Sequence, residues 1–136
     1  MPVCDNVESE RAMDVACRLA EPHAAVTSVS VVEVPALLPL DAHMREEEAR
    51  AHAALQRARA IAETYGVSYT PRLLRGRQAA EAIVSEAESR DVQLIVIAAV
   101  RRQPRRGPAA LGGTVEHVLR HAACRVLVIE ELQAAA

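Results

Sequence analysis

The stretch that decides the fold class is Leu94-Ile95-Val96-Ile97-Ala98-Ala99-Val100. It is a continuous run of uncharged, apolar side chains with no polar alternation. A strand that helices cover on both faces has no polar side, so it is a continuous apolar run in the sequence. The run is far shorter than the roughly 20 residues that a membrane-spanning helix needs. It therefore predicts a buried strand of a parallel sheet.

Further strands are predicted on both sides of this run. Including the run itself, the stretches rich in valine, isoleucine or leucine are Ala25 to Val34, Val67 to Leu74, Val92 to Ala99 and Cys124 to Ile129. Only Met1, Pro2 and Val3 stand where a strand should precede the first helix. We therefore expect the chain to begin inside its first strand.

Helical patterns separate the strands. The first, from Glu8 to about Ala20, follows Asp5, and the spacing of Asp5 and Glu8 is that of a capping box. The second is long, with Asp41 expected as its N-cap and Gly66 as the glycine that follows its end near Tyr65. Apolar positions mark a third helix from Ala79 to Ala87 and a short fourth from Val115 to Ala122.

Strict alternation of helices and strands predicts an α/β fold, a doubly wound parallel sheet with helices on both faces. The chain has 136 residues, the size of one domain, and no linker divides it, so residues 1–136 are expected to form a single domain. The longest connections are Pro35 to Asp41 and Arg101 to Gly113. Binding residues often lie on such loops.

Composition excludes several classes of protein. The formal net charge is −2 and only two residues are aromatic, Tyr65 and Tyr69, which argues against nucleic-acid binding. All 16 basic residues are arginine, so lysine-dependent P-loop and Schiff-base chemistry is absent. Cys4, Cys17 and Cys124 form neither a disulfide framework nor a zinc pattern. No signal peptide or membrane span is evident, so we expect a cytoplasmic protein without membrane insertion.

Five segments match, in order, the pattern of one protein family: Ser9-Glu10-Arg11-Ala12, Arg75-Gly76, Ala79-Ala80-Glu81-Ala82-Ile83, Leu94-Ile95-Val96-Ile97 and the closing stretch from Gly113 to Ile129. Together they resemble the universal stress protein family. Glu33-Val34-Pro35 and Leu38-Pro39-Leu40-Asp41 further resemble a subgroup of these domains, some of which lie at the C-termini of membrane transporters. The resemblance covers almost the whole chain.

This resemblance implies a five-stranded parallel sheet of order 3-2-1-4-5 and a homodimer formed through the strand Cys124 to Ile129. Sheets of this kind bind ligands where the strand order reverses. If a nucleotide such as ATP or AMP, or another anion, binds, the resemblance implies these site residues: Cys4, Asp5, Val31, Ala98, Arg101, Gly113, Thr114 and Val115.

The phosphate-binding motif of ATP-binding family members is broken in this chain. Those members have two glycines, three positions apart, after the fourth strand, and then Gly-Ser or Gly-Thr. Only Gly113-Thr114 remains. Counted from the end of the strand, Ala98 and Arg101 take the positions of the earlier glycines; counted back from Gly113, Val100 and Gln103 take them, so neither alignment restores the motif. Cys4 takes the position of the family's aspartate near the adenosine, with Asp5 displaced by one. Glycine lets a phosphate approach the backbone closely, so weak nucleotide binding or none is expected.

Each candidate site also has a plain structural interpretation. Gly113-Thr114 is either an anion site at a helix start or an ordinary N-cap by Thr114. Arg101, Arg102, Arg105 and Arg106 either bind an acidic ligand or decorate a solvated loop. His117, His121 and Cys124 have helical spacing for a metal, but no further ligand completes the set, so no metal is expected. No catalytic pattern emerges, and a small residue at a strand end suffices to explain Cys4.

The sequence therefore predicts a regulatory or ligand-sensing domain that acts as a homodimer and has a degenerate nucleotide site. Two alternatives stay open. One is an ATP- or AMP-binding member with slow hydrolysis. The other is a regulatory domain that serves a membrane transporter as its protein partner.

Overall fold

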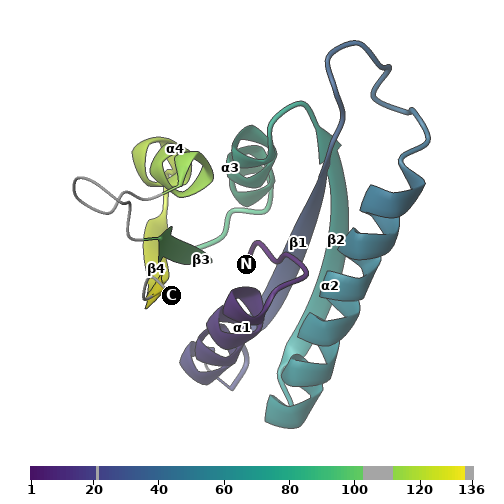
Figure 1. The fold of residues 1–136 in the computed structure, drawn as a ribbon. Helices are drawn as coiled ribbons and strands as arrows, with labels where there is room; N and C mark the ends of the chain where they lie inside the picture. Colours follow the sequence, from purple (N-terminus) through teal and green to yellow (C-terminus); the bar gives the residue numbers. More distant parts are fainter. Residues whose placement is uncertain (21, 103–111, 134–136) are drawn as a thin grey trace.

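The computed structural model describes residues 1–20, 22–102 and 112–133 (Figure 1). Helices and strands alternate along the chain, as the sequence predicts. In order they are α1 (Val7–Leu19), β1 (Ala25–Glu33), α2 (Arg45–Tyr65), β2 (Ser68–Gly76), α3 (Ala79–Ser89), β3 (Leu94–Arg102), α4 (Gly113–His121) and β4 (Arg125–Gln133).

The strands form two parallel pairs. β1 pairs with β2, with Ala25 opposite Ser68, and β3 pairs with β4, with Leu94 opposite Arg125. The segment Met1–Val3 runs parallel to β1 and forms an isolated bridge from Pro2 to Val29. The expected single sheet of order 3-2-1-4-5 is therefore not what the described residues form. They form two two-stranded sheets with a short extended segment on the edge of β1.

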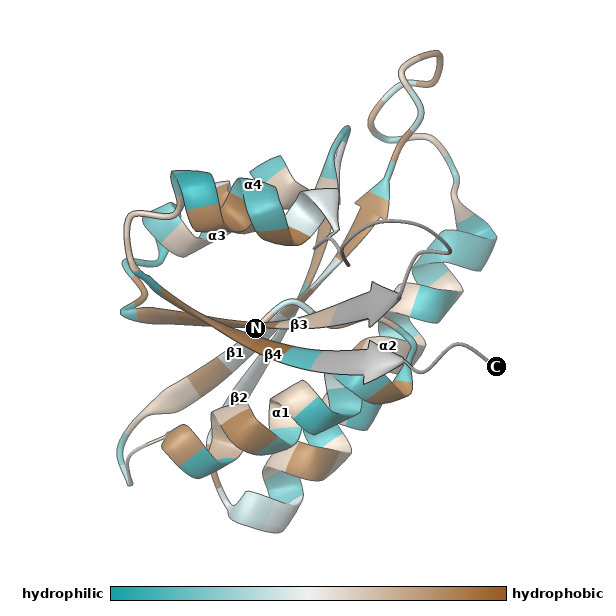
Figure 2. Cartoon of the chain, turned by 60° about the vertical axis from the view of Figure 1, so that its left-hand side comes forward, coloured by the Kyte–Doolittle hydropathy of each residue, from teal (hydrophilic) through white to brown (hydrophobic). Residues whose placement is uncertain are grey.

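Helices cover both faces of these strands (Figure 2). α1 and α2 pack on each other, with α2 against β1 and β2 and α1 against β3. On the opposite face α3 packs against β1, β2 and α4, while α4 also contacts β3 and β4. On one face, α1 packs against the β3–β4 pair, and on the opposite face α3 packs against the β1–β2 pair. This arrangement is the two-faced α/β layering that the sequence pattern predicts.

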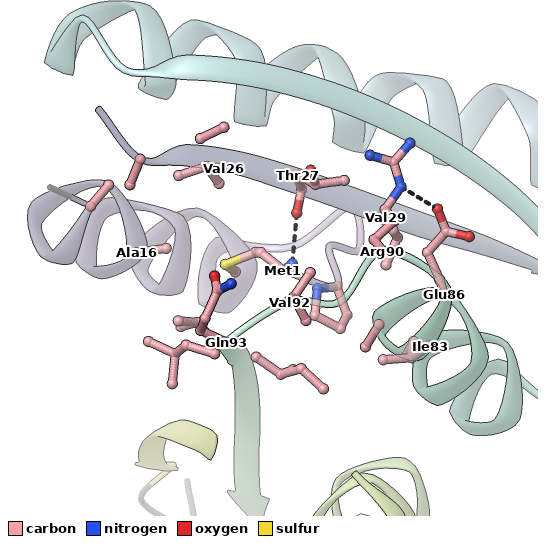
Figure 3. A pocket seen from close by; sticks show the side chains of 18 of the residues that line it. Met1, Ala16, Val26, Thr27, Val29, Ile83, Glu86, Arg90, Val92 and Gln93 are labelled. Atoms are coloured by element: carbon pink, nitrogen blue, oxygen red, sulfur yellow. Dashed lines mark hydrogen bonds and ion pairs between the residues drawn. The ribbon is translucent and has the colours of Figure 1, made fainter. Parts of the chain in front are cut away.

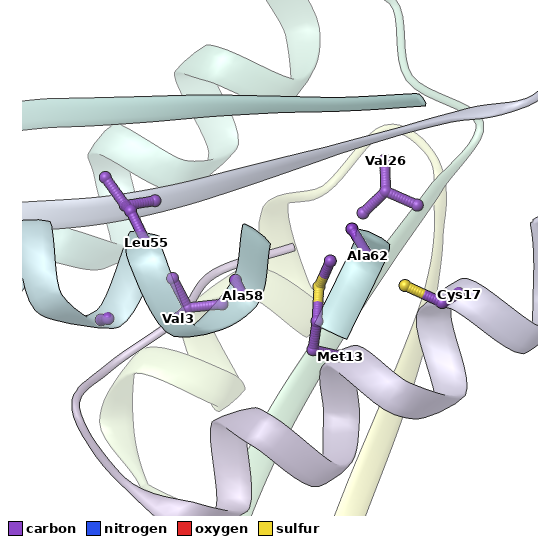
Figure 4. Close-up of a cluster of buried hydrophobic side chains, with 8 residues drawn as sticks. Val3, Met13, Cys17, Val26, Leu55, Ala58 and Ala62 are labelled. Atoms are coloured by element: carbon purple, nitrogen blue, oxygen red, sulfur yellow. The ribbon is translucent and has the colours of Figure 1, made fainter. Parts of the chain in front are cut away.

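One apolar cluster fixes α1 and α2 against β1 (Figure 4). Met13 of α1 is fully buried, and its sulfur accepts a hydrogen bond from the Ser28 hydroxyl of β1 at 3.5 Å. The facing side of α2 carries alanines at several contact positions, including Ala58 and Ala62. Small side chains let the two helices approach each other and the strand closely. Met13, being long and unbranched, fills the remaining space.

The helix ends differ from the sequence prediction in two places. Asn6, not Asp5, caps α1, and its Oδ1 accepts the Ser9 N–H at 2.8 Å. α2 begins at Arg45 without a side-chain cap, so the prediction of Asp41 as its N-cap is wrong. Gly66 follows α2 in a left-handed conformation, φ +66°, which confirms the predicted glycine cap.

β3 and β4 both end later than predicted. β3 continues past Ala99 to Arg102, and β4 continues past Ile129 to Gln133, with Ala99 opposite Glu130 and Arg102 opposite Gln133. The two extensions pair with each other. The composition of the segment after Ala99 favours a loop, but mutual backbone pairing extends both strands.

Glu86 of α3 forms ion pairs with β2 and with the residue that ends its own helix (Figure 3). Its carboxylate is only 14% exposed and lies 2.9 Å from Arg72 Nε of β2 and 2.7 Å from Arg90 Nε after α3. The hydrogen bond from Arg72 lowers the pKa of Glu86, burial opposes that shift, and Arg90 adds to the lowering. These contacts hold α3 to the edge of β2.

Replacing Met13 by alanine should destabilise the fold by about 2–5 kcal/mol, because it leaves a cavity between α1, α2 and β1. Urea denaturation followed by circular dichroism measures this free energy of unfolding. Leu37→Ala is the control, since the Leu37 residue is 98% exposed and its loss should change the free energy by less than about 0.5 kcal/mol. Equal effects of the two substitutions would contradict the assigned core.

The Glu86→Gln variant should be less stable than the parent chain at pH 7, by about 1 kcal/mol or less. The folded-state pKa of Glu86 lies below its ordinary 4.5, so the ion pairs stabilise the fold above that pH. Their contribution begins to fall below pH 4.5 and is lost once the pH passes below the lowered pKa of Glu86, where the two chains should become equally stable. Thermal melts from pH 7 to pH 3 test this, with Glu88→Gln on the exposed side of α3 as the matched control.

Candidate functional site

The candidate site lies where the parallel strands end and the next helices begin. Pro2 pairs with Val29, so the same register places Cys4 at the level of Val31. Val31 is half-buried and packs against the apolar cluster on the side of α3 and α4. In that register Cys4 and Val31 both lie toward the carboxyl end of β1, and the backbone bond nearest to them is the one from the Val3 N–H to the Val29 carbonyl.

Cys4 has an exposed surface but a protected thiol. Its backbone N–H donates to Ser9 Oγ at 2.9 Å, which fixes the turn into α1. The protein atoms packed around the sulfur raise the pKa of the Cys4 thiol, and the negative charge of Glu33 raises it further. The thiol is therefore protonated at neutral pH. Cys4 offers a weak hydrogen-bond donor where the resemblance expects a carboxylate.

Asp5 supplies a carboxylate, but α2 engages it. Arg57 Nη1 contacts Asp5 Oδ1, and Arg57 Nε lies 3.9 Å from Glu10 Oε1. The ion pair explains why Asp5 does not cap α1 and leaves that position to Asn6. It also orients the Asp5 carboxylate toward α2.

Ala98 and Arg101 are strand residues. Ala98 lies opposite Ile129, and Arg101 lies opposite Leu132, both within the β3–β4 pair. Ala98 is half-buried and packs against the cluster of Ala12, Ala16 and Val96. The backbone at these positions therefore forms a ladder with β4 instead of a turn.

Gly113, Thr114 and Val115 form the first turn of α4. Gly112 is the N-cap and no side chain caps the helix, so the prediction of Thr114 as N-cap is wrong. Thr114 is exposed and Val115 is buried against the cluster that includes Ile83. The first N–H groups of a helix lack partners within the helix, and they carry its positive end. This first turn is the part of the candidate site with free backbone donors.

The remaining predicted candidates are the arginines at and after the end of β3 and the histidines of α4. Arg105 and Arg106, and the side chains of Arg101 and Arg102, lie outside the described residues. His117 and His121 stack with ring centroids 4.2 Å apart. Within residues 1–20, 22–102 and 112–133, no three histidine, cysteine or acidic side chains lie close enough to hold a metal ion.

Sequence reasoning missed the arginines that order the loop after β1. Arg77 Nη1 donates to the carbonyl oxygens of Pro35 at 2.5 Å and Leu38 at 2.7 Å, and Arg75 Nη1 donates to that of Ala42 at 2.8 Å. Glu33, at the end of β1, accepts the first N–H of α3 from Ala79 at 3.0 Å. These contacts join residues more than 30 positions apart, so no local sequence pattern predicts them.

Several solved structures with the same fold are universal stress proteins. The one from Archaeoglobus fulgidus is 22% identical, with a TM-score of 0.76 over 91% of this chain and 90% of that chain. The Lactobacillus plantarum protein is 26% identical, with a TM-score of 0.69 over 94% and 93%. A Burkholderia pseudomallei family protein is 25% identical, with a TM-score of 0.69 over 94% and 91%.

None of the helices in the described parts is long and apolar enough to cross a membrane.

Two further comparisons concern the family. The first found no curated protein sequence that matches the chain. The family model described as the universal stress protein family matches residues 1–130, nearly the whole length. The chain therefore belongs to the universal stress protein family.

Proposed function

We propose that this chain is a regulatory or ligand-sensing universal stress domain that binds adenine nucleotides weakly and acts as a homodimer without catalytic activity. The observation that carries the proposal is the course of β3. The segment from Ala98 to Arg102 stays paired with β4. When the resemblance is counted from the end of the strand, this segment includes both positions at which ATP-binding members of the family have their first two glycines.

A paired strand is a poor phosphate site. Phosphate-binding loops aim successive N–H groups at one point, whereas successive N–H groups of a strand point in opposite directions. Ala98 and Arg101 also carry Cβ atoms, which hinder the close backbone approach that glycine permits. These features support a site that has lost its main phosphate contacts.

The other end of the site supports the same conclusion. The Cys4 thiol is neutral at pH 7, and the Asp5 carboxylate pairs with Arg57. A hydrogen bond to a charged group is roughly twice as strong as a neutral one. The family's charged acceptor near the adenosine is thus replaced by a neutral thiol, which is a weak donor and a weak acceptor.

Relatives indicate which ligand to test. Among structures with this fold, one universal stress protein was solved with cAMP, the Archaeoglobus fulgidus protein with dAMP and an Arabidopsis thaliana protein with AMP. They share only 20%, 21% and 14% identity with this chain, so they support the fold and suggest an adenine nucleotide. In this chain, the N–H groups in the first turn of α4, at Gly113-Thr114, would bind the phosphate of such a nucleotide.

Titration calorimetry with Mg-ATP, AMP and cAMP should give dissociation constants much weaker than 1 μM, the affinity that corresponds to about −8 kcal/mol. The reason is the missing phosphate loop and the missing carboxylate. A dissociation constant near 1 μM for any of the three would refute the degenerate site. Such a result would support the alternative of a nucleotide-binding member.

A substitution locates any residual binding. Gly113→Pro removes one N–H from the first turn of α4, a position where proline is compatible with a helix. It should reduce residual AMP affinity severalfold, while Arg45→Pro, the same substitution at the first residue of α2 and outside the candidate site, should leave it unchanged. Equal affinities of the two variants would exclude the start of α4 as the phosphate site.

The homodimer is proposed through β4, at the edge of its pair. Among the described residues, β4 pairs only with β3, so its other edge has free backbone groups that template another strand. The apolar run Val126 to Ile129 contains neither charge nor proline to discourage pairing. Val126 and Val128 pack on the side of α3 and α4, and Leu127 and Ile129 on the side of α1. A twofold axis would pair two copies antiparallel.

Proline substitution in β4 should release monomers, because proline removes a backbone donor. N–H direction alternates along a strand, so only one of Leu127→Pro and Val128→Pro removes a donor from the free edge. The variant that keeps its circular dichroism spectrum should sediment as a monomer at micromolar concentration. The control is Arg120→Ala, on the exposed face of α4, which should stay dimeric. Two results would refute the interface. One is a monomeric parent chain, and the other is that both Leu127→Pro and Val128→Pro fold and remain dimeric.

A further inference from the structure

Two histidines lie side by side on α4. His117 and His121 are one helical turn apart, and their ring centroids are 4.2 Å apart with the ring planes tilted by 38°. Residues four positions apart on a helix are neighbours on its surface. The proposed nucleotide site uses only the first turn of α4, so this pair of imidazoles has no role in it.

The pair lies on the outer side of α4. Val115 and Val118 are buried and hold the inner side of the helix against the core. His117 follows Val115 by two positions, which is about 200° around a helix, so it lies on the other side. His121 is exposed and His117 is partly exposed. Because α4 lies at the outside of the molecule beside α3 (Figure 1), a dissolved ion reaches both rings.

Both rings are available to an ion. Among the described residues, neither imidazole forms a hydrogen bond or an ion pair. An uncharged imidazole has one nitrogen that accepts a metal. The charged neighbours on α4 are Glu116 and Arg120, which are both exposed and of opposite sign. The histidines also lie toward the C-terminal end of α4, where the partial negative charge of a helix favours a cation.

The distance between the rings matches one metal ion with its two ligands at a right angle. A metal–nitrogen bond of about 2.0 Å places a ring centroid about 3.2 Å from the metal. Two rings at a right angle then have centroids about 4.5 Å apart, and two rings at a tetrahedral angle about 5.2 Å apart. The observed 4.2 Å is nearer to the first value. Right angles between ligands are typical of square-planar and octahedral ions such as Cu²⁺ and Ni²⁺.

We propose that His117 and His121 together bind one divalent transition-metal ion, with Ni²⁺ and Cu²⁺ preferred over Zn²⁺ and with water at the remaining positions. Two imidazoles on one side of a helix form a chelate without a third protein ligand, so the absence of a further ligand in the sequence pattern does not exclude the site. The site differs from a structural zinc site, which has four protein ligands. It lies at the opposite end of α4 from the proposed phosphate contact, and the two sites are independent.

Titration calorimetry with nickel chloride tests the proposal. The chain should bind one Ni²⁺ at this site with a dissociation constant of about 100 μM or tighter. His117→Ala and His121→Ala should each weaken this binding at least tenfold, because a single imidazole forms no chelate. His52→Ala, at an exposed position of α2, is the matched control and should leave the affinity unchanged. Zinc chloride should bind more weakly than nickel chloride, because the rings have the spacing of a right angle.

A double variant separates chelation from the number of histidines. His121→Ala combined with Leu119→His keeps two histidines on α4, but residues two positions apart do not face each other on a helix. This variant should bind Ni²⁺ as weakly as His121→Ala alone. Leu119 is 44% exposed, so the fold should tolerate the change, and thermal melts without metal check this.

Thermal melts with metal provide a second readout. An ion that binds both imidazoles only in the folded helix stabilises the folded chain. At about 1 mM Ni²⁺, the parent chain and His52→Ala should therefore melt a few degrees higher than without metal. The melting temperatures of His117→Ala and of the double variant should not change by that amount.

Any of four results would overturn the proposal. The first is no Ni²⁺ binding at millimolar concentration. The second is a double variant that binds Ni²⁺ as tightly as the parent chain. The third is a Cys124→Ser variant that loses as much affinity as His117→Ala, which would place the ion on the thiol. The fourth is tighter binding of Zn²⁺ than of Ni²⁺.

Discussion

The pairing of Met1–Val3 with Val29 is the interaction on which the rest of the structure depends. These backbone bonds hold the start of the chain on the edge of β1, and α1 begins four residues after Val3. α1 then crosses to β3, so the same bonds also position the second strand pair. The turn that follows Val3 places Cys4 at the candidate site. One short extended segment thus links the core and the candidate site.

Local patterns predicted the element types, and long-range contacts decided the details. The apolar run Leu94 to Val100 lies in β3, and Gly66 ends α2, because both depend on neighbouring residues alone. The prediction that Asp5 caps α1 was wrong because Arg57, 52 positions away, pairs with Asp5. The ends of β3 and β4 were misplaced because each strand lengthens against the other. The resemblance gave a single five-stranded sheet, but Met1–Val3 is too short to bridge both pairs along their length.

The candidate site was less predictable than the fold. The sequence pattern predicted that Cys4 and Val31 lie toward the same end of the strands, since the start of the chain runs parallel to β1. The neutral state of the Cys4 thiol and the commitment of Asp5 to Arg57 arise from burial and from α2, neither of which local sequence reports. The assignment of residues 1–136 to one domain and of the eight site residues to a ligand stays a prediction. What the structure adds is a physical reason to expect few phosphate contacts: paired backbone between Ala98 and Arg102.

The separation of the strands into two pairs also affects how the molecule responds to temperature. Each pair is held by its own backbone hydrogen bonds, whereas α1 and α3 connect the pairs through apolar side-chain packing. Hydrophobic burial weakens on cooling, while hydrogen bonds within each pair do not share that dependence. Cold should therefore loosen the joint between the pairs before it disrupts either pair. The chain would then retain both halves as local, cooperative units that exchange amide hydrogens independently of each other.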